Sequence, residues 1–249
     1  MVYLYTFLSV GLVSVISFVG ALFLFLSPQR LKTVIMFLVS LSAGTLLADA
    51  TLHLIPEAIQ SQGLVFSVWL WFMSGILTFF VLEKVIHWHH CHLDPEACDH
   101  DPAAFGLVNI IGDSLHNMID GAVIAGSFLI SVPLGVATTI AVVAHEIPHE
   151  MGNFGVLLHA GYSRARALTL NFLSALVSVL GALITLLISS NNQNLLAFII
   201  PFTAGNFVYI ATTDLIPELK HDTGAGKSVQ QFVGILIGIG LMILLKKWG

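Results

Sequence analysis

The hydrophobic residues of this chain gather into long runs that short polar segments separate. A helix needs about 20 mostly apolar residues to cross the hydrocarbon core of a bilayer. On that criterion the sequence predicts eight membrane-spanning helices, at about residues 4–26, 34–55, 66–86, 107–130, 133–159, 166–189, 195–219 and 229–245. We therefore expect one all-α transmembrane domain over residues 1–249, with a histidine-rich loop at about 87–105.

Composition favours a membrane protein as well. Hydrophobic residues make up 57% of the chain and charged residues only 9%, whereas soluble domains have about 25% charged residues. The formal net charge of −5 and the lack of a basic stripe in the sequence argue against a nucleic-acid partner. The expected surroundings are a lipid bilayer, and a homodimer is a candidate assembly.

The basic residues predict the orientation in the membrane. Cytoplasmic loops are enriched in Lys and Arg. Of the 9 basic residues, Lys246 and Lys247 follow the last span. The others lie in or beside the loops that follow spans 1, 3, 5 and 7, namely Arg30, Lys32, Lys84, Arg164, Arg166, Lys220 and Lys227. This pattern predicts a plasma or bacterial inner membrane protein with both termini outside the cell.

A short sequence echo suggests an internal repeat. The second predicted span ends in His-Leu-Ile-Pro-Glu at 53–57, and the seventh ends in Asp-Leu-Ile-Pro-Glu at 214–218. These two spans cross the membrane in opposite directions. The echo therefore predicts inverted halves, spans 1–3 and 6–8, on either side of a central pair formed by spans 4 and 5.

The two central spans each carry a block of metal-ligating residues. The blocks read His-Asn-Met-Ile-Asp-Gly at 116–121 and His-Glu-Ile-Pro-His-Glu at 145–150. Side chains at i and i+4 share a helix face, which pairs His116 with Asp120 and His145 with His149. Each ionisable group in mid-membrane costs roughly 2.5–3.5 kcal/mol. Such a cluster needs mutual pairing, water or a bound cation, and a bound cation makes the chain a candidate transporter.

The residue types predict which cation. Two or three imidazoles with a carboxylate suit zinc, and Fe(II) and Mn(II) are also accepted. Pro148 cannot donate to the Ala144 carbonyl, so a kink and a free acceptor are expected in span 5. Gly121 and Gly152 are expected to allow close backbone approach beside the two blocks.

Two alternatives compete with metal transport. The polar side chains of the two blocks can hydrogen-bond one another and join the helices without a metal. The second block also satisfies H-E-x-x-H, in which Glu is the general base of a zinc protease. An intramembrane zinc protease using His145, Glu146 and His149 is therefore the second candidate function. Pro148 counts against it, because it distorts the helix that must hold both histidines.

These motifs resemble those of the ZIP (Zrt/Irt-like) divalent-metal transporter family. The matching segments are 116–121 in span 4, 145–154 in span 5, 52–57 in span 2, and 204–209 with 214–218 in span 7. The resemblance implies eight spans, outward termini, and import of zinc, or of iron, manganese or cadmium, by alternating access rather than an enzymatic reaction. It also implies a primary site of His116, Asp120, His145 and His149, and a neighbouring site of Asn117, Glu146 and Glu150.

Further polar residues are candidates for the ion pathway. Asp49 and His53 lie one turn apart, and either form a hydrogen-bonded pair or receive the ion on the outer side. Asp113, Asp214 and Glu218 are candidate pathway or gate residues. The loop ligands either bind metal incidentally or accept the ion in the cytoplasm, where thiols stay reduced; they are His87, His89, His90, Cys91, His92, Cys98 and His100.

Overall fold

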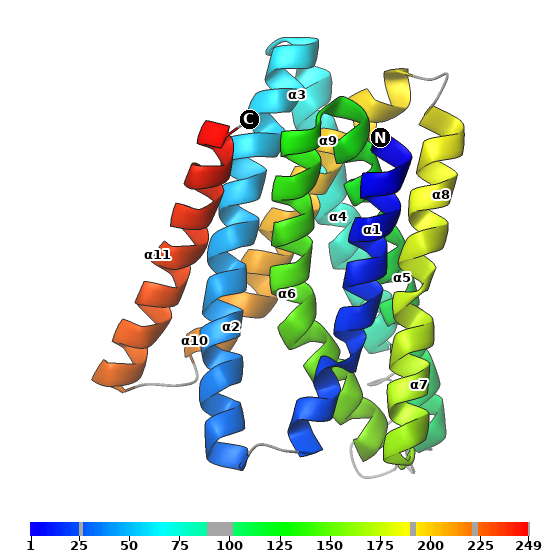
Figure 1. Cartoon of the computed structure of the whole chain (residues 1–249), viewed down its shortest axis with the longest axis vertical. Coiled ribbons are helices and arrows are strands. Elements are labelled where there is room, and N and C mark those ends of the chain that lie inside the picture. Colours follow the sequence, from blue (N-terminus) through cyan, green and yellow to red (C-terminus); the bar gives the residue numbers. More distant parts are fainter. Residues whose placement is uncertain (25–26, 89–101, 190–192, 221–223, 249) are drawn as a thin grey trace.

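The computed structural model describes residues 1–24, 27–88, 102–189, 193–220 and 224–248, and its regular structure in these ranges is entirely helical. The elements run in this order: α1 (Val2–Ile16), η1 (Ser17–Leu24), α2 (Pro28–Ala48), η2 (Asp49–Leu54), α3 (Ile55–Gln62), α4 (Phe66–Trp88), α5 (Pro102–Ile130), α6 (Val132–His159), α7 (Arg164–Ala175), α8 (Val177–Ser189), α9 (Gln193–Tyr209), η3 (Ile210–Leu215), α10 (Ile216–Lys220) and α11 (Ala225–Trp248). Both termini lie at the same end of the bundle (Figure 1).

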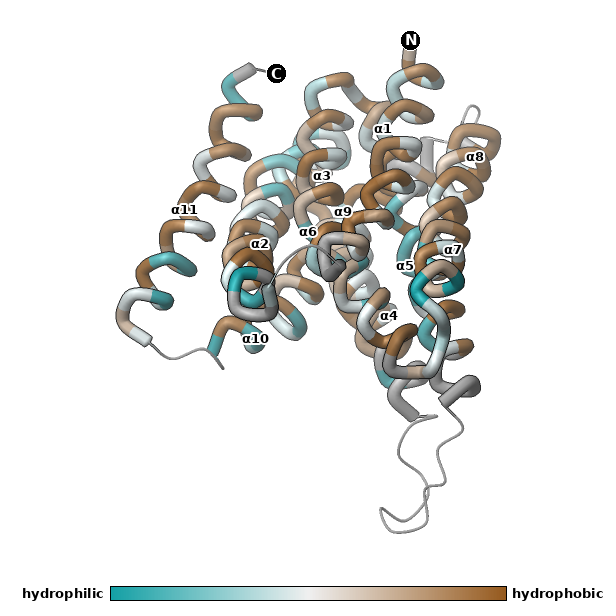
Figure 2. The backbone as a smooth tube through the Cα atoms, turned by 60° about the horizontal axis from the view of Figure 1, so that its bottom comes forward, coloured by the Kyte–Doolittle hydropathy of each residue, from teal (hydrophilic) through white to brown (hydrophobic). Residues whose placement is uncertain are grey.

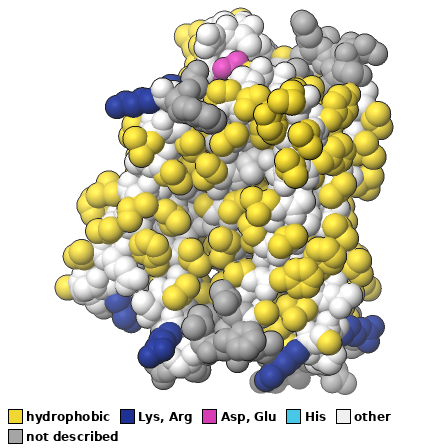
Figure 3. Space-filling view, viewed as in Figure 1, with side chains coloured by type: hydrophobic (Ala, Val, Ile, Leu, Met, Phe, Trp, Pro, Cys, Tyr) yellow, Lys and Arg dark blue, Asp and Glu magenta, His cyan; other side chains and the backbone are white. Residues whose placement is uncertain are grey.

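Length and composition identify five of the described helices as able to cross a membrane. These are Val2–Ala21, Lys32–Gln62, Arg164–Ile188, Ala197–Lys220 and Ala225–Lys247. Long hydrophobic stretches run along the peripheral helices α1, α8 and α11 (Figure 2). Hydrophobic side chains cover the flank of the molecule, and Lys and Arg lie toward its two ends (Figure 3). The predicted class, an all-α integral membrane protein, is confirmed.

Glycine pairs set the closest helix contacts. The most extensive packing joins α5 with α8, α2 with α11, and α4 with α9. In each pair a glycine on either helix faces the backbone of the other, so an added Cβ would overlap a carbonyl group; these glycines are Gly121 and Gly181, Gly44 and Gly238, and Gly75 and Gly205. Lipid tails are as apolar as leucine, so membrane helices associate through such close packing rather than by the hydrophobic effect.

Gly121 and Gly152, which the sequence predicts to allow close backbone approach, differ in how near another helix comes. A Cβ on Gly121 would overlap the Ser178 carbonyl of α8, which confirms the close approach predicted there. The prediction for Gly152 is wrong, since an added Cβ would meet nothing within 4 Å. Gly152 lies on an exposed face of α6, where no neighbouring backbone approaches.

The polar helices occupy the middle of the bundle. The helix α6 packs against α5, α2 and α1, and α5 also contacts α9 and α4. In Figure 1, α6 runs between α2 and α1. The polar residues of the second and seventh predicted spans lie on η2, η3 and α10, which continue α2 and α9. These two helices adjoin the pair that carries the ligand blocks, since α2 packs against α6 and α9 against α5.

Each copy of the sequence echo begins inside a π-helical turn. The turns are η2 and η3, and in each the next amide donates to a carbonyl five residues back, Ile55 to Ala50 and Ile216 to Ala211. Prolines follow directly, and a proline has no N–H with which to continue a regular α-helical ladder. The two related sequences thus adopt the same uncommon backbone.

The glycine contacts make a testable prediction about stability. Gly181→Ala places a methyl group against the Met118 carbonyl of α5, and overpacking of this kind costs about 1–3 kcal/mol. Gly240→Ala is the matched control in α11, because nothing lies within 4 Å of the added Cβ. We expect thermal unfolding in detergent to show a lower midpoint for Gly181→Ala only. Equal midpoints for the two variants would contradict the close α5–α8 contact.

Candidate metal centre

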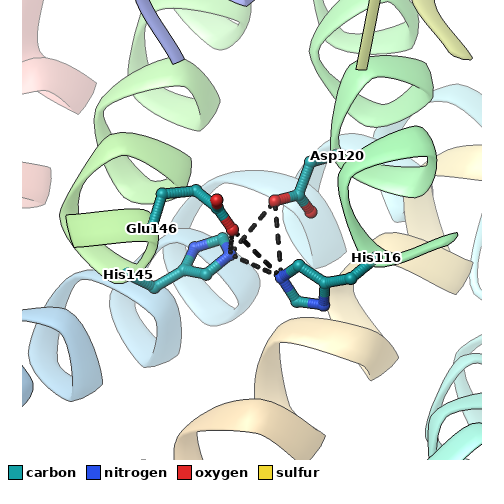
Figure 4. A group of neighbouring side chains, drawn as sticks. All are labelled: His116, Asp120, His145 and Glu146. Atoms are coloured by element: carbon teal, nitrogen blue, oxygen red, sulfur yellow. Dashed lines mark hydrogen bonds and ion pairs between the residues drawn. The ribbon is translucent and has the colours of Figure 1, made fainter. Parts of the chain in front are cut away.

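Four side chains from the two central helices converge on one point. His116 and Asp120 come from α5, and His145 and Glu146 come from α6 (Figure 4). One ligand atom from each lies within 4.8 Å of the other three. The Nε2 atoms of the two histidines are 3.2 Å apart. The α5–α6 packing thus joins the two sequence blocks into one cluster.

The remaining distances describe a compact polyhedron. The Asp120 Oδ2 atom lies 3.1 Å from His145 Nε2 and 3.6 Å from His116 Nε2. The Glu146 Oε1 atom lies 3.1 Å from His116 Nε2 and 3.3 Å from His145 Nε2. Zinc ligands at 2.0–2.2 Å in a tetrahedron are separated by about 3.3–3.6 Å. Five of the six donor–donor distances are therefore close to those of one tetrahedral zinc ion, and the sixth, between the Asp120 and Glu146 oxygens, lies within 4.8 Å.

The cluster is buried and rich in acceptors. All four residues are buried, and the two Glu146 oxygens and Asp120 Oδ1 receive no hydrogen bond from the described residues. A buried carboxylate without compensation is strongly unfavourable. A divalent cation would balance the charge of these two carboxylates.

A backbone contact fixes the orientation of His145. Its Nδ1 lies 3.2 Å from the Ala141 carbonyl oxygen one turn earlier. A carbonyl only accepts hydrogen bonds, so Nδ1 carries the proton and donates it. The Nε2 atom then offers its lone pair to the cluster, which is how metal-binding histidines are commonly held.

Pro148 has the local effect that the sequence predicts. It lies inside α6 and cannot donate to the Ala144 carbonyl. The Ser42 hydroxyl of α2 approaches that carbonyl oxygen to 2.5 Å and donates to it. The predicted free acceptor is therefore real, and a neighbouring helix supplies its donor. No sequence pattern singled out Ser42 for this role.

His149 lies beside the tight group rather than within it. Its Nδ1 is 3.9 Å from Glu146 Oε1, and its Nε2 is 3.7 Å from Asp113 Oδ1. Its ring centroid is 4.4 Å from that of His116. The side chain is 31% exposed, while that of Glu146 is fully buried. The structure thus groups Glu146 most closely with His116, Asp120 and His145.

Asp113 is held by donors from three helices. Its Oδ1 accepts from Asn117 at 3.2 Å and from Asn153 at 2.6 Å, and its Oδ2 accepts from Ser174. Sequence reasoning gave no role to Asn153 or Ser174. Asn153 is one turn beyond His149 on α6, a spacing that could have revealed it. Ser174 lies on α7, which offers no comparable signal.

More unpaired acceptors continue the cluster along α5 and α6. Both carboxylate oxygens of Glu150 are buried without a hydrogen-bond partner in the described residues, and so is Asn117 Oδ1. The Asn171 side chain donates to the backbone carbonyl of Glu150 at 3.3 Å, not to its carboxylate. These groups surround Asp113 and Glu146 with additional oxygen ligands.

Asp49 and His53 form a contact of their own. His53 Nδ1 lies 3.0 Å from Asp49 Oδ1, and both side chains are nearly inaccessible. His53 borders a cavity of about 210 Å³, which Glu57, Ser131 and Lys246 also line. The contact is an ion-pair distance without a hydrogen bond, since the side-chain polar atoms of Asp49 and His53 have no hydrogen-bond partner among the described residues.

The other candidates do not join the buried cluster. Asp214 and Glu218 are exposed at η3 and α10, and Asp214 accepts a hydrogen bond from Thr213 at 2.8 Å. The loop candidates His89, His90, Cys91, His92, Cys98 and His100 lie outside the described residues, as does the side chain of His87.

Comparison with known proteins relates this site to a family. A sequence model described as ZIP Zinc transporter matches residues 3–104 and 90–246. Zinc transporter ZIP13 of Pongo abelii is 35% identical over 224 residues, which cover 83% of this chain and 65% of that protein. Zinc transporter YKE4 of Saccharomyces cerevisiae is 31% identical over 250 residues, with coverage of 87% and 72%. Zinc transporter SLC39A7 of Mus musculus is 28% identical over 305 residues, with coverage of 88% and 64%.

The chain thus spans between 64% and 72% of the length of these relatives. All three are named as zinc transporters, and the comparisons give no support to the alternative of an intramembrane protease. Apolar helices and family together make the chain a multi-pass membrane protein, and its relatives are transporters rather than enzymes. Since the family model extends over most of its length, the chain belongs to the ZIP zinc transporter family.

Proposed function

We propose that this chain carries Zn²⁺ across a cell membrane into the cytoplasm, with Fe²⁺, Mn²⁺ and Cd²⁺ as further candidate substrates. The observation that carries the proposal is the cluster of His116, Asp120, His145 and Glu146, whose ligand atoms all lie within 4.8 Å of one another. Two imidazoles and two carboxylates form a donor set that suits zinc. The names of the relatives agree with this substrate.

The ion binds first between α5 and α6 and then meets a second set of ligands. Glu146 offers Oε1 to the cluster, while its Oε2 has no hydrogen-bond partner in the described residues. Asn117 and Glu150 also carry buried oxygens without partners there. We assign these three to a neighbouring site, with His149 and Asp113 beside it. This order gives the ion a continuous series of ligands along the two helices.

The proposed architecture has eight spans with inverted halves. The π-helical turns before both Ile-Pro-Glu segments support it. Packing supports it further. In such a repeat, spans 1, 2, 3 and 4 correspond to spans 6, 7, 8 and 5. The α2–α11 contact then corresponds to the α9–α4 contact, and the α5–α8 contact corresponds to the α6–α1 contact. All four of these contacts exist. Inverted repeats of this kind are common in membrane transporters.

Transport proceeds by alternating access between two groups of helices. One group contains α1, α5, α6, α7 and α8, and the other contains α2, α4, α9 and α11, since the most extensive packing lies within each group. Rocking of one group against the other would expose the site to either side in turn. The outer side holds Asp49 and His53. The inner side holds Asp214 and Glu218, followed by the histidine-rich loop as a candidate acceptor.

The cluster predicts which substitutions stop transport. Asp120→Asn replaces a charged carboxylate ligand by a neutral amide, and His145→Ala removes an imidazole ligand. Uptake of radiolabelled zinc into proteoliposomes should fall more than about 10-fold in each, given that changes to residues that only support the ligands cost 10–100-fold in affinity. Thr169→Ala is the control, because Thr169 is exposed on α7 and its hydroxyl donates to its own helix. Unchanged uptake by both ligand variants would refute the site.

The donor set also predicts selectivity. Ca²⁺ and Mg²⁺ prefer sites made only of oxygen ligands, so an excess of either should leave zinc uptake intact, whereas Cd²⁺ should compete. His145→Asp replaces a nitrogen donor by oxygen and should shift preference from zinc toward manganese. Competition assays on both proteins measure this. Strong inhibition of the wild type by Mg²⁺ would count against the assigned ligands.

Orientation is testable by labelling single cysteines. In a background with Cys91 and Cys98 replaced by serine, we introduce Leu64→Cys or Ser163→Cys. Leu64 is 74% exposed after α3, and Ser163 is exposed before α7. A membrane-impermeant maleimide should label the first variant in intact cells and the second only after permeabilisation, since basic loops face the cytoplasm. The reverse pattern would invert the proposed direction of the helices.

A further inference from the structure

Prolines inside two helices, α6 and α9, each leave a backbone carbonyl without its usual donor. Pro148 and Pro201 deprive the carbonyls of Ala144 and Ala197, each four residues earlier. Side chains from other helices donate to both carbonyls, and the donors are Ser42 and Gln62, respectively. Within a membrane, neighbouring side chains commonly satisfy backbone groups freed in this way.

The Ser42–Ala144 contact is the one at the metal centre. Ser42 is fully buried on α2, and its Oγ lies 2.5 Å from the Ala144 carbonyl oxygen. The same hydroxyl lies 2.7 Å from the Leu38 carbonyl of its own helix. In a regular α-helix, the Leu38 carbonyl already accepts the amide of Ser42. Only Ala144 lacks another donor, so the single hydroxyl proton belongs to it.

The position of this bond links it to the ligands. The Ala144 carbonyl belongs to the peptide group that leads directly into His145. One turn earlier, the Ala141 carbonyl accepts a hydrogen bond from the His145 ring. The backbone of His145 is therefore held by Ser42 and its ring by Ala141.

We propose that Ser42 is a positioning residue for the metal site: its hydroxyl takes the place of the amide that Pro148 lacks and fixes the His145 backbone at the height where the ion binds. The role rests on the proposed transport function. It assigns Ser42 to zinc affinity rather than to the rate of the conformational change.

The first test compares two buried serines of α2. Ser42→Ala leaves the Ala144 carbonyl without a donor. We expect the KM for zinc uptake in proteoliposomes to rise on the order of 10-fold, as for other changes to residues that support metal ligands, with an unchanged maximal rate. Ser40→Ala is the control, since Ser40 is also buried and its hydroxyl donates only to Phe37 of the same helix. A KM that stays unchanged in Ser42→Ala, or a change in maximal rate alone, overturns the proposal.

The second test uses Pro148→Ala, which restores an N–H able to donate to Ala144. In this background Ser42→Ala should change KM by less than about 2-fold, because coupled residues give non-additive effects. If Ser42→Ala raised KM by the same factor with and without Pro148→Ala, the role of Ser42 would be purely structural and the proposal would be overturned. Where Pro148→Ala abolishes transport, the Kd for zinc of the four purified proteins, measured by titration calorimetry, supplies the same comparison. If the wild-type protein took up no zinc, that result would instead refute the transport function, independently of Ser42.

Discussion

A carbonyl group that lacks an N–H partner inside the membrane is the constraint on which the centre of this molecule depends. Such a group finds no water and must receive a donor from protein. Pro148 creates one directly before the proposed ligand His145, and the Ser42 hydroxyl of α2 supplies the donor. The same solution recurs at Ala197, which accepts from Gln62. The breaks in the regular helices thus become points at which separate helices are joined.

Close contacts at glycines position α5, the second helix that contributes to the site. Gly181 of α8 approaches the backbone of α5 at Met118, and Gly121 approaches α8 directly after the ligand Asp120. The closest backbone contact of α5 therefore lies behind the turn that presents His116 and Asp120. A lipid environment offers little hydrophobic drive for helix association, so this contact gives α5 a defined position against which α6 can set its own ligands.

Sequence patterns predicted much of this arrangement, and the physical reasons are specific. The i, i+4 spacing fixes the helix face of His116 and Asp120, and the missing N–H of Pro148 fixes the free carbonyl of Ala144, because both are local properties. Which of Glu146 and His149 lies nearer the cluster depends on the rotation of α6 against α5, which no local pattern encodes. Ser42 and Ser174 belong to no ligand motif in the sequence, so their contacts appear only in three dimensions.

The geometry also favours a bound cation over hydrogen bonding between the polar side chains of the two helices. In the described residues, the ion pairs of Asp120 and Glu146 are all with histidines. The proton of His145 Nδ1 is engaged by Ala141, and the two facing Nε2 atoms, 3.2 Å apart, disfavour a proton on both. Four acceptor atoms would then share about one proton, an arrangement that hydrogen bonds cannot satisfy. A divalent cation accepts all four lone pairs at once. Too few protons are present for the four acceptors to hydrogen-bond one another, and for the same reason their lone pairs are available to a metal ion.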